Sequence, residues 1–421
     1  MKLLTVDVER PLPDIPPPST GEQWVLVRLH GEPLGVLKFT VDGYSSAELA
    51  ELIADKFVEA VMRHLAADRD VWSGSGELHT RCPRQGDFNR PHVTVAVCTR
   101  DGSARIAECL EALVGLQYTR ELLDVLVIDN APGDDRTRSL VETQYPSVRY
   151  VPEPRPGLNW ARNRAIIEAR GEIIAYTDDD VSVDPGWVDA LARIFAEEPE
   201  VDAVTGLVIP DEMDVEPQRL FEAYGGFGRG FERRYFRVNT QAGVLTSPMY
   251  GGSGQFGTGA NMAFRRSVFD RVGTFDPALD VGTPANGGGD LDLFFRVLKA
   301  GRTLVYEPAA TVRHRHRRTY EQLHTQLANN GIGFYAYLVR SAEAYRDERT
   351  AVVRLGIYWF FWWNVRRLLL SFVHPSRFPR DLILAELRGC FTGVRRYGRS
   401  KEVAENVRRT FGPQVGGGGT V

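Results

Sequence analysis

The sequence predicts an α/β protein whose main domain is a doubly wound mixed sheet, because apolar strands alternate with helical patterns. Short apolar runs typical of buried strands lie at residues 93–98, 123–128, 148–151 and 173–176. Patterns typical of amphipathic helices separate them, at residues 104–116, 136–144 and 159–170. Buried parallel strands joined by crossover helices form such a sheet. Its ligands bind beyond the carboxyl ends of the strands.

A smaller unit precedes this sheet. Two β-rich runs, 24–30 and 34–39, flank a short turn and predict a β-hairpin. An apolar stripe at helical spacing follows over residues 46–65 and begins at Ser46, a favourable N-cap. Residues 1–20 are rich in proline and predict an extended arm, and residues 70–91 predict a linker.

The end of the chain is basic and aromatic, although the 421 residues carry a net charge of only −4, which argues against a general nucleic-acid binder. From residue 340 onward there are 15 Lys and Arg against 7 Asp and Glu, a balance of 15 − 7 = +8. Residues 355–373 place Arg366 and Arg367 between two aromatic and apolar runs. This pattern predicts either a helix lying in a membrane interface or one packed on the main domain. We expect three units, at 1–90, 91–325 and 326–421, the last of them helical.

Several absences bear on location. The first 20 residues are charged and proline-rich, which is not typical of a signal peptide. No uninterrupted apolar run reaches about 18 residues, the length needed for a spanning helix. The four cysteines contain no C-x-x-C pair and resemble neither a disulfide framework nor a zinc site. We therefore expect a cytoplasmic protein, with a peripheral contact at the cytoplasmic face of the membrane as one alternative.

The strongest chemical signal is the end of the run at residues 171–180, where Asp178, Asp179 and Asp180 follow an apolar strand. Burying unpaired carboxylates is costly. Hard divalent ions prefer carboxylate oxygens, and they also bridge phosphates. The run therefore predicts a metal–diphosphate site. The alternative is capping of a helix that begins at Pro185, which needs fewer than three acids.

Three predicted strands end in polar residues, which should therefore meet in one crevice. These residues are Thr99, Arg100, Asp101, Asp129, Asn130, Asp178, Asp179 and Asp180. No Gly-x-Gly-x-x-Gly follows the first strand, and no Gly-x4-Gly-Lys-Ser/Thr occurs anywhere. The sequence thus argues against a dinucleotide oxidoreductase and a P-loop nucleoside triphosphatase.

An ordered series of motifs resembles the family 2 glycosyltransferases. It runs through Thr-Val-Ala-Val-Cys-Thr-Arg-Asp-Gly, Val-Leu-Val-Ile-Asp-Asn, Gly-Leu-Asn-Trp-Ala-Arg-Asn and the acidic run, and continues with Gly-Thr-Gly-Ala-Asn and Gly-Gly-Asp-Leu-Asp. Each motif is weak alone, but their shared order and spacing over residues 92–320 make the match specific. The resemblance implies a GT-A fold, a nucleotide-diphosphate sugar as donor, and Mn²⁺ or Mg²⁺ as cofactor.

The resemblance also implies roles on the donor side. Asp129 would meet the nucleotide base with Arg162 nearby, Asp178 would lie at the ribose, and Asp180 would bind the metal. In an extended segment Asp178 and Asp180 point to one side while Asp179 points away. Taken alone, Asp129 also suits a turn, and Arg162 a solvated helix face. Uridine as the base rests on the resemblance.

On the acceptor side, the glycine-rich run 251–261 either lets the backbone approach a ligand or forms a surface loop. The resemblance places Gly259 and Asn261 beside the transferred sugar. It also implies a catalytic base at the start of the predicted helix 291–300, which would take the proton of the acceptor hydroxyl. The family usually has Glu-Asp-x-Asp at this place, and here Gly289 stands in place of the first acid, which leaves Asp290 and Asp292. Asp290 is the first choice, with Asp292 as its supporter or substitute. Helix capping is the alternative for both carboxylates.

Two histidines follow a predicted strand at residues 303–306. The resemblance implies that one of them holds metal or pyrophosphate, and His314 is the candidate. His316 points the same way if the chain is extended. The alternative is a basic surface patch without a ligand.

Together these expectations describe a metal-dependent, inverting glycosyltransferase. It would move a sugar from a nucleotide-diphosphate donor, UDP-linked on the resemblance, to a hydroxyl of a cell-envelope glycan, a glycolipid or a metabolite. Direct displacement needs no covalent intermediate. The alternatives are a nucleotidyltransferase and a non-catalytic scaffold that binds sugar nucleotides, and Gly289 is the feature that favours the scaffold.

Overall fold

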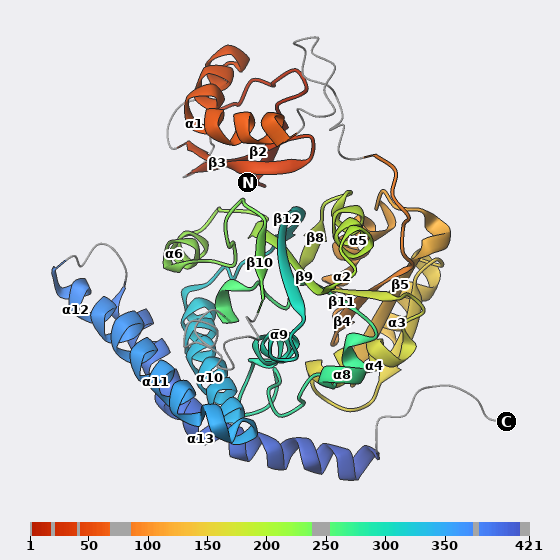
Figure 1. Ribbon diagram of the computed structural model, residues 1–421, viewed down its shortest axis with the longest axis vertical. Helices are drawn as coiled ribbons and strands as arrows, with labels where there is room; N and C mark the ends of the chain where they lie inside the picture. Colours follow the sequence, from red (N-terminus) through yellow and green to blue (C-terminus); the bar gives the residue numbers. More distant parts are fainter. Residues whose placement is uncertain are drawn as a thin grey trace.

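The computed structural model describes residues 2–17, 22–39, 43–67, 86–237, 253–373 and 379–412. Figure 1 shows a small N-terminal unit, a central α/β body, and a group of C-terminal helices at the periphery. Most of the predicted linker lies outside the described residues. So do residues 251–252 of the glycine-rich run and the tail from residue 413 onward.

The N-terminal unit is a three-stranded sheet with one helix. The hairpin and the helix are present as predicted, as β2 (Gln23–Leu29), β3 (Glu32–Phe39) and α1 (Ser46–Ala67). The prediction of an extended arm was wrong in part, because β1 (Leu4–Asp7) pairs in parallel with β2. The sheet order is β1-β2-β3. The prolines that follow so short a strand, from Pro11 onward, concealed it.

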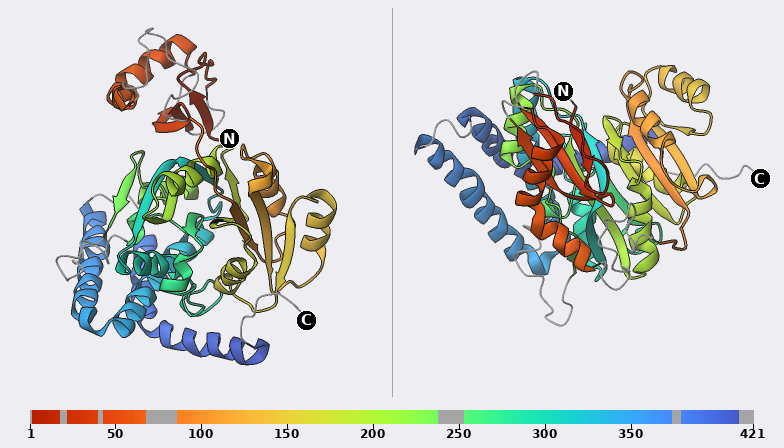
Figure 2. Two further views of the ribbon diagram at one scale, coloured as in Figure 1. Left: turned by 45° about the vertical axis from the view of Figure 1, so that its right-hand side comes forward. Right: turned by 90° about the horizontal axis from the view of Figure 1, so that it is seen from above.

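This unit is fixed to the central body (Figure 2). Trp24 and Leu26 project from one face of its sheet into an apolar cluster with Leu207 and Ile209 of the body. Leu3 joins the same cluster, and its N–H donates to the carbonyl of Asp211 at 2.9 Å. Side chains on the other face pack on α1. The sheet is therefore covered on both faces.

Among the described residues the central sheet has nine strands, eight of them in the order β10-β12-β9-β11-β7-β4-β5-β6, while β8 pairs with β12. Its parallel half is β4 (Val93–Thr99), β5 (Leu123–Asn130), β6 (Arg149–Glu153) and β7 (Ile173–Asp178). The remaining strands are β8 (Val181–Val183), β9 (Val201–Pro210), β10 (Arg234–Phe236), β11 (Asn261–Arg265) and β12 (Thr303–His314). Because β11 runs antiparallel to both β7 and β9, the predicted mixed sheet is confirmed.

Helices cover both faces of this sheet. They are α2 (Ile106–Val114), α3 (Arg136–Gln144), α4 (Leu158–Glu168), α5 (Trp187–Glu197), α6 (Glu216–Tyr224), α8 (Val268–Val272) and α9 (Gly289–Lys299), with short turns η1 (Arg120–Leu122) and η3 (Ser253–Gln255). One core cluster joins Leu110 of α2 and Trp187 of α5 to the strands. A second joins Ala161 of α4 and Phe294 of α9 to the opposite face. Because β4, β5 and β7 are parallel, their carboxyl ends lie at the same edge of the sheet.

The C-terminal region is helical, as predicted. It comprises α10 (Tyr320–Ala344), η4 (Arg346–Glu348), α11 (Arg349–Trp359), a π-helical turn η5 (Phe360–Val365), α12 (Arg366–Val373) and α13 (Arg380–Phe411). The lack of a side chain at Gly389 lets helices α10 and α13 pack closely, since a Cβ there would lie 2.2 Å from the carbonyl oxygen of Ala328. In the part of the chain that the structure describes, no helix is long and apolar enough to cross a membrane.

Candidate active site

Asp178, Asp180 and His314 form a group of metal-ligating side chains at one edge of the sheet. Asp178 ends β7, and Asp180 stands in the turn before β8. Strand β12 runs antiparallel to β8 and pairs His314 with Val181, which carries the imidazole to the acids. Ligand atoms of all three residues lie within 4.8 Å of one another. His314 Nε2 lies 3.4 Å from Asp180 Oδ1.

The electrostatics of this group fit a divalent cation. Burial, opposed by the nearby Arg162 and reinforced by the neighbouring acids, raises the pKa of Asp178 to about 7. Its side chain is 35% exposed, so water moderates this effect. Burial lowers the pKa of His314 to about 4, with Asp180 opposing, and the imidazole is therefore neutral at neutral pH. A neutral imidazole beside two carboxylates is a donor set that suits Mn²⁺ or Mg²⁺.

The structure separates the two histidines that the sequence left together. His316 directs its Nε2 to Glu222 of α6, at 2.7 Å, and away from the acids. Its Nδ1 lies 3.4 Å from Nδ1 of His314. His316 therefore holds the imidazole ring of His314 in its orientation, as neighbours of metal ligands commonly do. The predicted strand was too short, since β12 continues to His314 itself.

Asp179 points away from the metal group, as its place between two inward residues predicts. Thr99 donates its hydroxyl to Asp179 Oδ2 at 2.6 Å, and Arg105 pairs with the same oxygen at 3.2 Å. A Cβ on Gly102 would lie 2.7 Å from this oxygen, so the glycine gives the carboxylate room. Thr99 and Asp179 thus join the ends of β4 and β7.

Asp129 offers a free acceptor at the end of β5. It is fully buried, and Tyr150 donates its hydroxyl to Oδ2 at 2.9 Å. No described residue forms a hydrogen bond with Oδ1. A buried oxygen without a partner suits an N–H donor from a ligand, because leaving it unpaired is costly. Asn130 instead braces the next loop, donating to the carbonyl of Arg155 at 2.7 Å and accepting from the amide of Gly157 at 2.8 Å.

The other residues predicted at these strand ends lie at the surface. Arg100 and Asp101 are both exposed beyond β4. Asp101 accepts from the amide of Gly133 at 3.1 Å and has a positive φ of 49°. It therefore fastens two loops at the strand ends, where their backbone turns.

Arg162 lies between the acidic group at the end of β7 and the loop that holds Gly259. Its Nη2 lies 3.9 Å from Asp178 Oδ1. A Cβ on Gly259 would be 2.6 Å from that same Nη2 and 3.3 Å from Asp290 Oδ2. The amide of Gly259 donates to Asp290 Oδ2 at 2.9 Å, and the amide of Leu291 donates to Oδ1 at 2.9 Å. Asp290 is thereby held in place at the N-terminus of α9.

Asp292 is enclosed, whereas Asp290 borders the site. Asp292 is fully buried and pairs with Arg296 at 2.8 Å and with Arg340 of α10 at 3.0 Å. This geometry makes it a support for α9 and not a second open carboxylate. Packing explains why a glycine stands at position 289, since a Cβ there would lie 2.3 Å from Asn159 Nδ2. The glycine therefore does not by itself indicate lost chemistry.

Asn261 is not brought to the open site. It is fully buried at the start of β11, and its side-chain oxygen accepts from Trp187 Nε1 at 2.9 Å. Its amide group donates to the carbonyls of Leu207 and Ala310, at 3.0 and 2.8 Å. These bonds place it inside the sheet, where it positions the strand that follows Gly259.

Comparisons with known proteins follow this geometry. A family described as Glycosyl transferase family 2 matches residues 94–273. This segment carries β4 to β7 and also the loop that holds Gly259. Residues 94–273 are a family 2 glycosyl transferase domain.

Curated relatives and solved structures show more distant likeness. The chain is 24% identical over 190 residues to a glucosyl-dolichyl phosphate glucuronosyltransferase of Haloferax volcanii, covering 44% of this chain and 56% of that protein. It is 25% identical over 306 residues to a pre-mycofactocin glycosyltransferase of Mycobacterium tuberculosis, covering 70% and 54%. The chain thus spans about half the length of these relatives. A mannosyltransferase structure from Pyrobaculum calidifontis, in complex with GDP-Man and Mn²⁺, has a TM-score of 0.46 at 18% identity, covering 86% of this chain and 98% of that one.

Two residues around the glycosyl transferase domain were missed by the sequence reasoning. Asp280 is almost fully buried and accepts from the amide of Asn159 at 2.8 Å, and burial raises its pKa to about 7. Its Oδ1 has no hydrogen-bond partner among the described residues. Arg317 Nη1 lies 3.8 Å from Asp180 Oδ2. Asp280 stands in no motif that marks it, and Arg317 is one of several arginines in a basic run.

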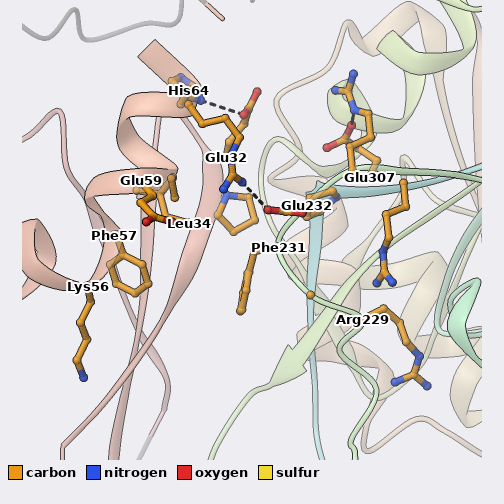
Figure 3. Close-up of a pocket in the computed structure, with 17 residues that line it drawn as sticks. Glu32, Leu34, Lys56, Phe57, Glu59, His64, Arg229, Phe231, Glu232 and Glu307 are labelled. Carbon is orange, nitrogen blue, oxygen red and sulfur yellow. Dashed lines mark hydrogen bonds and ion pairs between the residues drawn. The ribbon is translucent and has the colours of Figure 1, made fainter. Parts of the chain in front are cut away.

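A cavity of about 910 Å³ lies elsewhere, between the N-terminal unit and the glycosyl transferase domain. Figure 3 shows Lys56 and Phe57 of α1 on one side and Arg229 and Phe231 on the other. None of the predicted site residues lines it. The chemistry of the acidic group is therefore separate from this cavity.

Proposed function

We propose that this protein is a metal-dependent, inverting glycosyltransferase that transfers a sugar from a nucleotide-diphosphate donor to an acceptor hydroxyl. The observation that carries the proposal is the position of Arg162. Its guanidinium stands 3.9 Å from Asp178 in the metal-ligating group and beside Gly259, whose amide holds Asp290. A cation site and a fixed carboxylate thus adjoin one another within a family 2 domain.

Asp180 and His314 would hold the metal, and Asp178 is close enough to join them. A bound divalent cation stabilises the negative charge that develops on a departing nucleoside diphosphate. Arg162 supplies a second positive charge at the same edge. Asp129 would accept from the nucleobase through its unpaired Oδ1. Thr99 and Asp179 would keep the loop after β4 in place.

Asp290 would act as the catalytic base. Both its oxygens already accept backbone amides, which fixes the direction of the carboxylate. A carboxylate so placed takes the proton from the acceptor hydroxyl as that oxygen attacks the anomeric carbon. Attack from the face opposite the leaving group inverts the anomeric centre. Asp292 and Asn261 would act as positioning residues.

The finer identity of the substrates rests on resemblance. We propose a UDP-linked hexose as donor and Mn²⁺ or Mg²⁺ as the metal, and an acceptor among cell-envelope glycans, glycolipids and metabolites. No observation on the described residues specifically favours the two alternatives, a non-catalytic scaffold and a nucleotidyltransferase. Packing around Gly289 removes the one feature that favoured a scaffold.

The proposal also covers organisation and place. The units would be 1–90, 91–325 and 326–421, with the first bracing the transferase domain through the cluster around Trp24. We propose a cytoplasmic protein that contacts the membrane peripherally through its C-terminal helices. Their basic and aromatic composition supports this location.

Release of nucleoside diphosphate from a panel of nucleotide sugars tests the function. We expect release from one donor with Mn²⁺ or Mg²⁺, and none with a chelator. Addition of candidate acceptors should raise the rate, and the product should have the inverted anomeric configuration. Retention of configuration would refute direct displacement, and release unaffected by the chelator would refute metal dependence.

A further inference from the structure

An apolar ridge lies exposed along the C-terminal helices. Helices α11 and α12, with the π-helical turn between them, pack one side onto the protein through Val352, Leu355 and Gly356, which are buried. Tyr335 of α10 donates its hydroxyl to the carbonyl of Gly356 at 2.7 Å. The other side carries large apolar residues that are 40–70% exposed: Val353, Ile357, Tyr358, Phe361, Trp362, Leu369, Leu370, Phe372 and Val373. We call this set the C-terminal ridge.

The members of the ridge recur at intervals of three and four residues within residues 353–362 and again within residues 369–373, which places each set on one side of its helix. Tyr358 and Trp362 stack with their rings 6.1 Å apart and nearly parallel. Phe391 of α13, itself 66% exposed, lies beside it with its ring 5.1 Å from that of Phe360. An apolar surface of this extent marks a place of contact.

The segment that carries the ridge has charges of one sign. Residues 349–373 contain four arginines and no aspartate or glutamate. Arg366 lies over the ring of Trp362 at 4.7 Å, and Arg380 lies over that of Phe372 at 4.5 Å. Arginines at the rim of an aromatic face suit an anionic surface, because they can reach headgroups while the rings enter the interface.

We propose that the C-terminal ridge docks the protein on an anionic lipid bilayer, lying in the interface without crossing it. The inference rests on the proposed peripheral location and names the surface and the lipid chemistry. Tyrosine and tryptophan prefer the headgroup region, and the cationic rim supplies the second contribution that stable peripheral binding needs. Figure 1 shows these helices on the opposite side from the strands of the parallel half.

The ridge also adjoins the site. Arg367 of α12 lies over the ring of Tyr224 of α6 at 3.7 Å. Two residues earlier in α6, Glu222 holds His316, the neighbour of His314. One helix therefore separates the docked face from the metal-ligating group. A docked protein would hold its metal-ligating group near the lipid surface.

Co-sedimentation of the full chain with vesicles tests the proposal. The probes are phosphatidylcholine vesicles alone and vesicles with about 30% phosphatidylglycerol. We expect binding to the anionic vesicles, weakened severalfold by about 0.5 M salt, and little binding to the neutral ones. The combined variant Tyr358→Ser, Phe361→Ser and Trp362→Ser should bind the anionic vesicles at least about tenfold more weakly than the unmodified chain. Absence of binding by the unmodified chain would overturn the proposal.

Two controls keep the result specific. Val58→Ser with Met62→Ser removes apolar side chains of α1 that are 51% and 60% exposed, and it should bind vesicles like the unmodified chain. Arg354→Gln with Arg366→Gln leaves the rings and should lose the preference for anionic vesicles. Sedimentation velocity distinguishes a second copy: a dimer that the triple variant dissociates would show that the ridge is a subunit interface, and would refute docking on lipid.

The outcome is separable from that of the proposed function. Donor turnover measured without vesicles should be the same in the triple variant and the unmodified chain. If no form of the protein turned over any donor, the transferase proposal would fail while the vesicle result still stood. If turnover were normal and no form bound vesicles, only the docking proposal would fail.

Discussion

The amide of Gly259 donates to Asp290 Oδ2 at 2.9 Å, so the glycine-rich loop fixes the carboxylate that borders the site. The loop contributes backbone here, and a side chain at Gly259 would meet Arg162. The loop and the N-terminus of α9 therefore form one unit. The two backbone amides, of Gly259 and Leu291, are sufficient to orient the Asp290 carboxylate.

Asp290→Asn should abolish transfer and leave the donor bound. The amide oxygen of asparagine still accepts from one of the two backbone amides, whereas its NH2 group cannot accept from the other, and the side chain cannot take a proton. We expect a fall in turnover of about 10²–10⁴-fold, the range of general-base contributions. Calorimetry with donor and metal should give an unchanged dissociation constant. Wild-type turnover in this variant would exclude Asp290 as the base.

His314→Ala should weaken metal binding more than His316→Ala does. His314 offers a neutral nitrogen toward Asp180, whereas His316 orients it through an Nδ1 contact. Loss of a supporting neighbour costs about 10–100-fold in metal affinity, and loss of a ligand should cost more. Titration of Mn²⁺ followed by electron paramagnetic resonance measures both. The reverse order of effects would mean that His316 is the ligand.

Glu386 should make stability fall as pH rises. It is buried in α13, no described residue bonds its Oε2, and burial raises its pKa from 4.5 to about 8. Between those values the unfolded chain releases the proton while the folded chain keeps it, so the free energy of unfolding declines over this window. Glu386→Gln removes the effect. We expect the stability gain of the variant to grow to a few kcal/mol by pH 8.

Denaturant unfolding at pH 5, 6.5 and 8 compares the two proteins. If the difference in the free energy of unfolding did not change with pH, the pKa of Glu386 would be the same in the folded and the unfolded chain, and the prediction would be wrong. The magnitude at pH 5 reports the amide substitution itself and serves as the reference.

Gly289→Ala should destabilise the domain. The new Cβ would stand 2.3 Å from Asn159 Nδ2 and 2.9 Å from the carbonyl oxygen of Leu279. Overpacking of this kind costs about 1–3 kcal/mol. Gly398→Ala in α13 is the matched control, because nothing lies within 4 Å of its added Cβ and alanine favours the helix. Equal thermal midpoints for the two variants would contradict the packing account of Gly289.

The parallel half of the sheet could be predicted because its strands are continuous apolar runs with helices between them. Strand β9 was missed although all ten of its residues are buried. The regular alternation of strands and helices is lost between β9 and β11, where α6 is the one α-helix among the described residues. In addition, β11 pairs with its neighbours in antiparallel orientation. Pairing between strands so far apart in sequence depends on tertiary contacts that a local pattern does not contain.

The candidate site could be predicted in its ligands and less well in its supports. Consecutive acids at a strand end indicated the metal group, and the structure places His314 beside them. The enclosure of Asp292 depends on Arg340, 48 positions further along the chain, and that of Asn261 on Trp187. Asp280 carries no motif at all. Such partners become visible only when the chain is folded.

The most direct test of the central claim is calorimetric titration of the cognate nucleotide sugar into the unmodified chain and into Asp180→Ala, each with Mn²⁺ and with chelator. The account predicts donor binding by the unmodified chain that needs metal and is lost in the variant. Thermal unfolding of both proteins verifies that the variant is folded. Equal, metal-independent binding by the two proteins would contradict a metal site at Asp180 and with it the proposed mechanism.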